Sequence, residues 1–191
     1  MSLGRTSSLI VLLAAMCASA AAQPVNYRLD PAHSFVHFEV MHFRTSTIRG
    51  RFGPLQGTVT LDRNAGRGEV GVTIDTTTLD TGLKVFDARL REPDLLSTAV
   101  YPQAWFVARR FRFEAGQLKE VRGEFTLRGV SQPLSLVAKR FGCHEHPQHK
   151  REVCGGDFEG EVMRSEFGMT FGLPFIADRV RLVLQVEGIR E

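Results

Sequence analysis

Three histidines lie close together near the start of the chain, and imidazole nitrogens are common metal ligands. They are His33, His37 and His42, within the stretch DPAHSFVHFEVMHF from Asp30 to Phe43. The stretch alternates as a β-strand does, with successive side chains on opposite faces. His33 and His37 then share a face about 13 Å apart at 3.3 Å per residue, and His42 lies on the other face. Because zinc–nitrogen bonds are about 2 Å long, we predict no metal site here.

Two cysteines and three histidines form a second cluster, and thiolates with imidazoles can hold a tetrahedral zinc ion. The cluster contains Cys143, His144, His146, His149 and Cys154. In an oxidising compartment, however, an isolated cysteine pair at this spacing is expected to form a disulfide. We therefore predict a Cys143–Cys154 disulfide within a polar loop, worth about 3 kcal/mol from chain entropy. Weak metal binding by the histidines remains open.

The residue types of a nucleophilic triad also occur together, since Ser34 adjoins His33 and Asp30 is nearby. Adjacent residues of a strand point to opposite faces, so Ser34 and His33 are badly placed for the hydrogen bond that activates a nucleophile. The sequence has no nucleophile elbow and no phosphate-binding glycine loop. We predict no enzymatic activity.

The elements that would position these groups are mostly strands. Period-two alternation recurs along the chain and is clearest from Arg179 to Glu187. One helix is predicted from Leu83 to Arg91 because apolar residues there have helical spacing and Pro93 ends it. The polar stretch Thr45–Phe52 ends in Gly53-Pro54 and is predicted to be a bend. Strands joined by short turns, with one helical excursion, indicate an antiparallel β-barrel.

The apolar strand faces are rich in phenylalanine: the chain has 14 Phe but two Tyr and one Trp. Phenylalanine offers large contact area and no hydrogen-bonding group. An eight-stranded barrel is wide enough either to be filled by its own side chains or to hold one small ligand. The residues themselves leave both possibilities open.

The segment Met1–Ala22 has the pattern of a secretory signal peptide. One charge at Arg5 precedes an apolar run from Leu9 to Ala15, and small residues follow. We predict cleavage near Ala22 and a periplasmic location. Lipidation at Cys17 is an alternative, although a bulky residue precedes that cysteine.

The rest of the chain is nearly balanced in charge. Of the 24 basic residues only Arg5 lies in the signal segment, which leaves 23 against 21 acidic residues and a net charge of +2. That balance predicts no nucleic-acid partner. No other segment is apolar enough for a transmembrane helix.

Several motifs together resemble the YceI-like family of exported polyisoprenoid-binding proteins. They are LDPAHSFVHFEVMHF…IRGRFGPLQGTVTLD (Leu29–Asp62), FDARLREPDLLSTAVYP (Phe86–Pro102), GEFTLRGVSQPLSL (Gly123–Leu136) and RSEFGM (Arg164–Met169). The resemblance runs from about Asn26 to Glu187, and its specificity comes from the order and spacing of the motifs. It implies one domain over residues 23–191, namely a mainly β, eight-stranded antiparallel lipocalin-like β-barrel with one short helix packed near it.

The resemblance also implies an apolar tunnel that holds a long isoprenoid chain. We expect the inward strand faces to line it, namely Val36, Phe38, Val40, Val72, Ile74, Trp105, Val107, Phe111, Phe113, Phe125, Leu127, Leu136, Phe158, Val162, Leu182 and Leu184. The family often has a histidine where this chain has Arg89, between Asp87-Ala88 and Leu90. An arginine near the tunnel mouth would favour a phosphate or other anionic head group. His37, Arg89 and Arg109 are the head-group candidates.

The predicted function is therefore an exported carrier that binds an isoprenoid lipid or quinone as its ligand, without another cofactor, for transport, storage or stress protection. The protein is expected to be a monomer or homodimer. One alternative is an enzyme acting on an isoprenoid or other apolar substrate, for which His37, Glu39 and Asp87 are the titratable candidates. Another is an interaction domain whose barrel is filled and binds no ligand.

Overall fold

The computed structural model describes residues 23–148 and 150–191. The predicted signal peptide Met1–Ala22, with its cleavage site and Cys17, lies outside the described residues. The strands are β1 (Val25–Leu29), β2 (Phe35–His42), β3 (Ser46–Phe52), β4 (Gln56–Asp62), β5 (Arg67–Asp75), β6 (Gln103–Glu114), β7 (Gln117–Leu127), β8 (Val130–Glu145), β9 (Glu152–Met163) and β10 (Ile176–Arg190). The helix α1 (Lys84–Leu90) lies between β5 and β6, and short 3-10 turns span Thr76–Thr78 and Arg164–Phe167.

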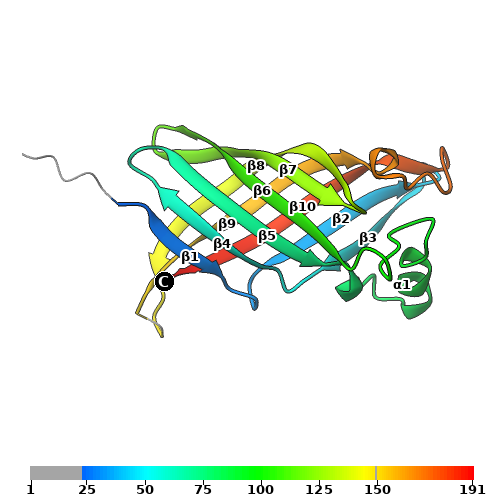
Figure 1. The fold of residues 1–191 in the computed structure, drawn as a ribbon, viewed down its shortest axis with the longest axis horizontal. Coiled ribbons are helices and arrows are strands. Elements are labelled where there is room, and N and C mark those ends of the chain that lie inside the picture. Colours follow the sequence, from blue (N-terminus) through cyan, green and yellow to red (C-terminus); the bar gives the residue numbers. More distant parts are fainter. Residues whose placement is uncertain (1–22, 149) are drawn as a thin grey trace, which may run out of the picture.

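Eight of these strands form a closed barrel (Figure 1). The hydrogen-bonded order is β1-β4-β5-β6-β7-β8-β9-β10, and β10 bonds back to β1. Every pairing around the ring is antiparallel. The predicted eight-stranded antiparallel barrel with one short helix is confirmed.

Strands β1 and β2 lie end to end along β10 and together act as one barrel strand. Phe35 of β2 pairs with Gln185, and Leu29 of β1 pairs with Gly188. The fully buried Ser34 joins the two halves, because its Oγ donates to the Glu187 carbonyl at 3.2 Å and accepts the Glu187 N–H at 3.3 Å. The hydroxyl thus replaces the ladder bonds that the interruption removes.

The predicted bend at Thr45–Phe52 is wrong, because most of this stretch is β3, paired with β2. Its polar residues face solvent, while Ile48 and Phe52 pack against the core. Gly50 marks a close approach rather than a turn, since a Cβ at that position would lie 2.5 Å from Cζ of Phe38. The glycine makes room for the Phe38 ring inside the barrel.

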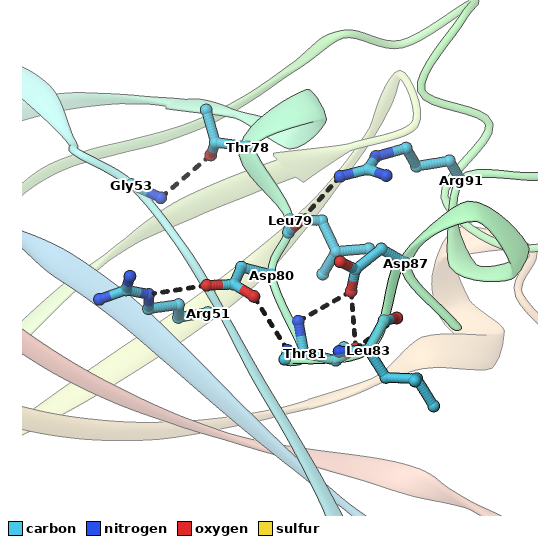
Figure 2. A network of polar contacts seen from close by, with 10 residues as sticks. Arg51, Gly53, Thr78, Leu79, Asp80, Thr81, Leu83, Asp87 and Arg91 are labelled. Atoms are coloured by element: carbon cyan, nitrogen blue, oxygen red, sulfur yellow. Dashed lines mark hydrogen bonds and ion pairs between the residues drawn. The ribbon is translucent and has the colours of Figure 1, made fainter. Parts of the chain in front are cut away.

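On its far side β3 pairs with no strand among the described residues, and the segment 76–102 covers this seam (Figure 2). Arg51 of β3 exchanges backbone hydrogen bonds with Asp80 at 2.9 and 3.0 Å. The Gly53 N–H donates to Oγ1 of Thr78 at 3.0 Å. Leu79, 2% exposed, enters the core beside these bonds. The open side of β3 is therefore covered by the segment 76–102, which carries α1.

Candidate functional site: a two-chamber apolar tunnel

The barrel interior contains two adjoining cavities. The first is here called the helix-end chamber. The space in it that the centre of a water-sized sphere can occupy is about 150 Å³. Its wall includes Val36, Phe38, Val40, Ala104, Phe125, Leu127, Leu134, Val162 and Leu182, and its end is covered by Leu90, Leu95, Leu96 and Met169. A single water needs about 10–15 Å³ by this measure, so the barrel's own side chains leave room for a ligand.

The second cavity, here called the disulfide-end chamber, has a volume of about 100 Å³ by the same measure. Its wall includes Tyr27, Leu29, Leu55, Val59, Leu61, Val70, Val72, Phe111, Leu118, Val121, Phe141, Cys154, Phe158 and Val186. Four residues border both chambers and form a waist between them: Ile74, Phe106, Leu136 and Leu184. The two chambers therefore adjoin at these four side chains, and the pair is here called the tunnel.

The disulfide closes the far end of this tunnel. Cys143 of β8 lies opposite Cys154 of β9, and the predicted disulfide between them is confirmed. The expectation of a polar loop was wrong, because both cysteines belong to paired strands and the turn is confined to the tip of the hairpin. Tyr27 and Leu61 pack with Cys154 into a separate apolar cluster that seals this end.

The tunnel wall contains few polar groups. The Tyr27 hydroxyl donates to Oε1 of Glu152 at 2.5 Å, and burial with this bond raises the pKa of Tyr27 to about 12. Thr76, 1% exposed, donates to the Tyr101 carbonyl at 2.8 Å. An apolar cavity whose polar neighbours are satisfied in this way gives water little to bind and favours a hydrocarbon.

Arg164 is the one charged residue in the chamber walls formed by described residues. It follows β9, is 5% exposed, and is held by three backbone carbonyls. Arg164 is not among the predicted site residues, because the sequence of RSEFGM predicts only a turn or a short helix, and the structure has a 3-10 turn there. A signal was available, since Arg164 has the same parity as the inward-facing Phe158 and Val162.

Most of the predicted lining residues border the tunnel. The helix-end chamber contains Val36, Phe38, Val40, Ile74, Phe125, Leu127, Leu136, Val162, Leu182 and Leu184, and the disulfide-end chamber contains Val72, Phe111 and Phe158. Phe113 packs against the core but borders neither chamber. Ligand contact by these side chains stays a prediction.

Two predicted lining residues point outward instead: Trp105 is 40% exposed and Val107 is 47% exposed. The reason is a register shift in β6 between Ala108 and Arg110. One extra residue in a strand exchanges the two faces beyond it. Ala104, Phe106 and Ala108 therefore face inward before the shift, and the odd-numbered Phe111 and Phe113 do so after it.

None of the three predicted head-group residues borders the tunnel. His37 lies in an outer groove of the barrel with Arg49 and Arg181. Arg109 is exposed and pairs with Glu69 at 2.7 Å. Arg89 makes two 2.7 Å hydrogen bonds to Asp94 and lies over the Phe171 ring at 4.3 Å. The strand parity of His37, the register shift at Arg109 and the helix surface position of Arg89 account for this placement.

Two of the titratable residues named for the enzyme alternative, Glu39 and Asp87, have structural partners outside the tunnel. Glu39 bonds to Arg49 at 2.9 Å and to Arg181 at 2.7 Å, and these bonds lower the pKa of its carboxyl group. Asp87 accepts from the hydroxyl and the N–H of Thr81 at 2.6 and 2.8 Å, which lowers its pKa (Figure 2). Asp87 thereby connects α1 to Thr81, within the segment 76–102 that covers the seam.

Comparison with known proteins gives consistent matches. The family described as the YceI-like domain matches residues 27–188. Protein YceI of Escherichia coli O157:H7 is 33% identical over 179 residues, covering 92% of this chain and 93% of that protein.

Among solved structures, Burkholderia cenocepacia BcnA superimposes with a TM-score of 0.69 at 21% identity, covering 83% of this chain and 98% of that one. A polyisoprenoid binding domain from Saccharophagus degradans, implicated in plant cell wall breakdown, gives a TM-score of 0.62 at 20% identity, covering 87% and 99%. At these sequence identities, both matches show that the fold is similar. No helix in the described ranges has the length and apolar character needed to cross a membrane.

Proposed function

The chain belongs to the YceI-like family, and we propose that it is an exported, periplasmic binding protein that holds one long-chain isoprenoid lipid, of the quinone or polyprenyl type, in the two-chamber tunnel. The observation that carries this proposal is the pair of adjoining apolar cavities inside the barrel, which share the four waist residues. Family and fold support binding rather than catalysis. Transport, storage and protection under stress are the roles that such a complex would serve.

Two further observations support the proposal. One solved structure with this fold is described as a polyisoprenoid binding domain. The Cys143–Cys154 disulfide fits an oxidising compartment, as does the predicted signal peptide. The ligand would be the protein's own cargo rather than a catalytic cofactor.

The dimensions of the tunnel suit a prenyl chain. Strand β10 contributes Val180 to Leu184 to the helix-end chamber and Leu184 to Gly188 to the disulfide-end chamber. Each stretch spans about 13 Å of strand, or about 10 Å of barrel axis at a strand tilt of about 40°. An extended chain advances about 1.2 Å per single bond, so one isoprene unit needs about 5 Å. The tunnel therefore accommodates about four units, two in each chamber.

Native mass spectrometry of protein purified from a bacterial periplasm tests the proposal, followed by organic extraction and lipid identification. We expect an added mass of several hundred daltons that resolves to a quinone or polyprenyl species. Leu184→Arg places an unpaired charge at the waist and should abolish lipid co-purification. Gln185→Arg is the matched control, because the neighbouring Gln185 is exposed on the outer face and should retain lipid.

The contrary result is a bare polypeptide mass that stays unchanged after incubation with isoprenoids. It would favour the interaction domain without ligand. Loss of lipid in both variants would show that general destabilisation, and not obstruction of the waist, removes the ligand. Circular dichroism of both variants separates folding from binding.

A further inference from the structure

Three exposed phenylalanine residues lie at the helix end of the barrel and are here called the aromatic rim. Phe43 belongs to the turn between β2 and β3, and Phe171 and Phe175 belong to the loop that precedes β10 (Figure 1). The rings of Phe43 and Phe175 stack with their centroids 5.4 Å apart, and the Phe43 N–H donates to the Phe175 carbonyl at 2.7 Å. The three residues are between 49% and 62% exposed, so much of their apolar surface faces solvent.

The aromatic rim adjoins the cover of the helix-end chamber. Arg89 of α1 lies over the Phe171 ring at 4.3 Å, so the loop before β10 contacts the helix. Met169, which belongs to the cover, directly precedes this loop, and Leu90 of α1 belongs to the same cover. Val85, also on α1, is 72% exposed. The segments that close the chamber therefore also present apolar side chains to solvent.

The backbone at Phe43 is strained in a way that folding alone does not explain. The turn is closed by the Thr45 N–H, which donates to the His42 carbonyl at 2.9 Å. Its two central residues have positive φ, 48° at Phe43 and 56° at Arg44. Glycine and asparagine suit this conformation, whereas a bulky side chain is disfavoured there. Because the Phe43 ring is also largely exposed, its presence at this position points to a role in binding.

Basic side chains stand next to the exposed apolar ones. Arg44 follows Phe43, and Lys84 begins α1; both are exposed, and neither forms an ion pair with another described residue. Glu92 and Glu166 are exposed at the same end, so the charges there largely offset one another and apolar contact must supply most of any affinity. Exposed rings beside basic side chains match a bilayer surface, where hydrocarbon lies beneath phosphate groups.

We propose that the aromatic rim inserts into the surface of a phospholipid bilayer and holds the helix end of the barrel against it. The assignment rests on the proposed function, since it names the membrane as the source of the lipid in the tunnel. A chain of several isoprene units is too apolar to cross water readily and resides in membranes. Docking in this orientation brings the cover formed by Leu90, Leu95, Leu96 and Met169 to the bilayer.

Co-sedimentation of delipidated protein with vesicles tests the docking surface. Vesicles of phosphatidylcholine, with and without phosphatidylglycerol, are the probes, and we expect the parent to bind both. Phe43→Asn combined with Phe175→Ser should weaken binding about tenfold to a hundredfold, because two rings lose their contact with hydrocarbon. Asparagine tolerates the left-handed backbone of the turn, so the variant should keep the fold, which circular dichroism checks.

Val107→Ser combined with Val137→Ser is the matched control and should bind vesicles as the parent does. Both valines are 47% exposed, but they lie on β6 and β8, outside the aromatic rim. Equal binding by the rim variant and the parent would overturn the assignment to Phe43 and Phe175. Release of the parent by raised salt would overturn insertion, because screening weakens charge attraction and not apolar contact.

Probe displacement by prenols, measured without vesicles, distinguishes this proposal from the proposed function. A parent that binds prenols in solution but no vesicles would overturn docking and leave the proposed function intact, whereas binding of neither would overturn both. Analytical ultracentrifugation identifies a competing occupant of the rim. A parent dimer that binds no vesicles and that the rim variant dissociates would assign the rim to a second copy of the chain and overturn the membrane assignment.

Discussion

The waist should set how the affinity for prenyl ligands depends on their length. On the proposed function, each chamber would hold about two isoprene units along about 10 Å of axis. Burying a unit of five carbons is worth at most about 4 kcal/mol at 0.8 kcal/mol per carbon, before the cost of ordering the chain. In the parent protein the affinity for prenols should therefore rise steeply up to about four units and change little beyond that length.

Leu184→Trp narrows the waist and should convert the tunnel into one usable chamber. The overpacking penalty is about 1–3 kcal/mol, and the adjoining cavities keep it near the lower end. The affinity of this variant should level off at about two isoprene units, while short ligands bind almost as in the parent. Gln185→Trp adds the same ring to the outer face of the same strand and should preserve the parent's dependence on length.

The assay is probe displacement by prenols of two, three, four and six or more units, which share a hydroxyl head group. Thermal unfolding of each variant confirms that the comparison is made on folded protein. The reasoning is refuted if the affinity of the parent keeps rising past six units, because the added carbons would then be buried elsewhere. It is refuted equally if Leu184→Trp levels off at the same length as the parent.

Three further predictions concern the frame around the tunnel. Replacing Cys143 and Cys154 together by alanine should lower the free energy of unfolding by about 3 kcal/mol in urea titrations. Gly50→Ala should cost about 1–3 kcal/mol by the same assay because its Cβ meets the Phe38 ring, and adding Phe38→Leu should recover part of the loss. Bonds from Arg122, Ser135 and Arg112 depress the pKa of Glu120 to about 2, so its stabilising effect is fully present above about pH 4.5 and is lost as the pH falls towards 2. Glu120→Gln should therefore lower the melting temperature at pH 7, and the deficit should shrink between pH 4 and pH 2; an equal deficit at every pH would contradict the ionic origin.

Strand parity predicted the tunnel wall wherever a strand is uninterrupted. Along β10 the alternation places Leu182 and Leu184 at the tunnel, as predicted. In β6 the same reasoning failed, because the register shift near Arg109 exchanges the inward and outward faces of the strand. No residue type in the sequence indicates this shift. Because side chains alternate with a period of two, a shift of one residue exchanges the two faces of a strand. The prediction therefore placed Trp105 inside, although it faces outward.

The positions of the arginine side chains were harder to predict than the residues of the tunnel wall. Arginines are frequent in this sequence, and most of those on the strands form ion pairs on the outer face, as Arg109 and Arg181 do. Parity with Phe158 and Val162 indicates that Arg164 faces inward, but its burial also depends on carbonyls contributed by Met169, Ile176 and Ala177, which lie beyond the strand that leads to it. The family resemblance predicted the barrel and proposed a ligand class, but it did not single out Arg164.

The pairing of the first strand with the last bears on how the proposed lipid ligand would enter the barrel. Tyr27 of β1 is in register with Arg190 of β10, so the ring cannot close until the final residues of the chain are available. A sheet not yet closed between β1 and β10 would admit the proposed lipid from the side, without threading. In the closed barrel the ladders would enclose such a lipid, and its release would require displacement of the segment 76–102 from its hydrogen bonds to β3. For the proposed complex, loading and release would then follow different routes, and the release route would depend on a few hydrogen bonds rather than on the strand pairings.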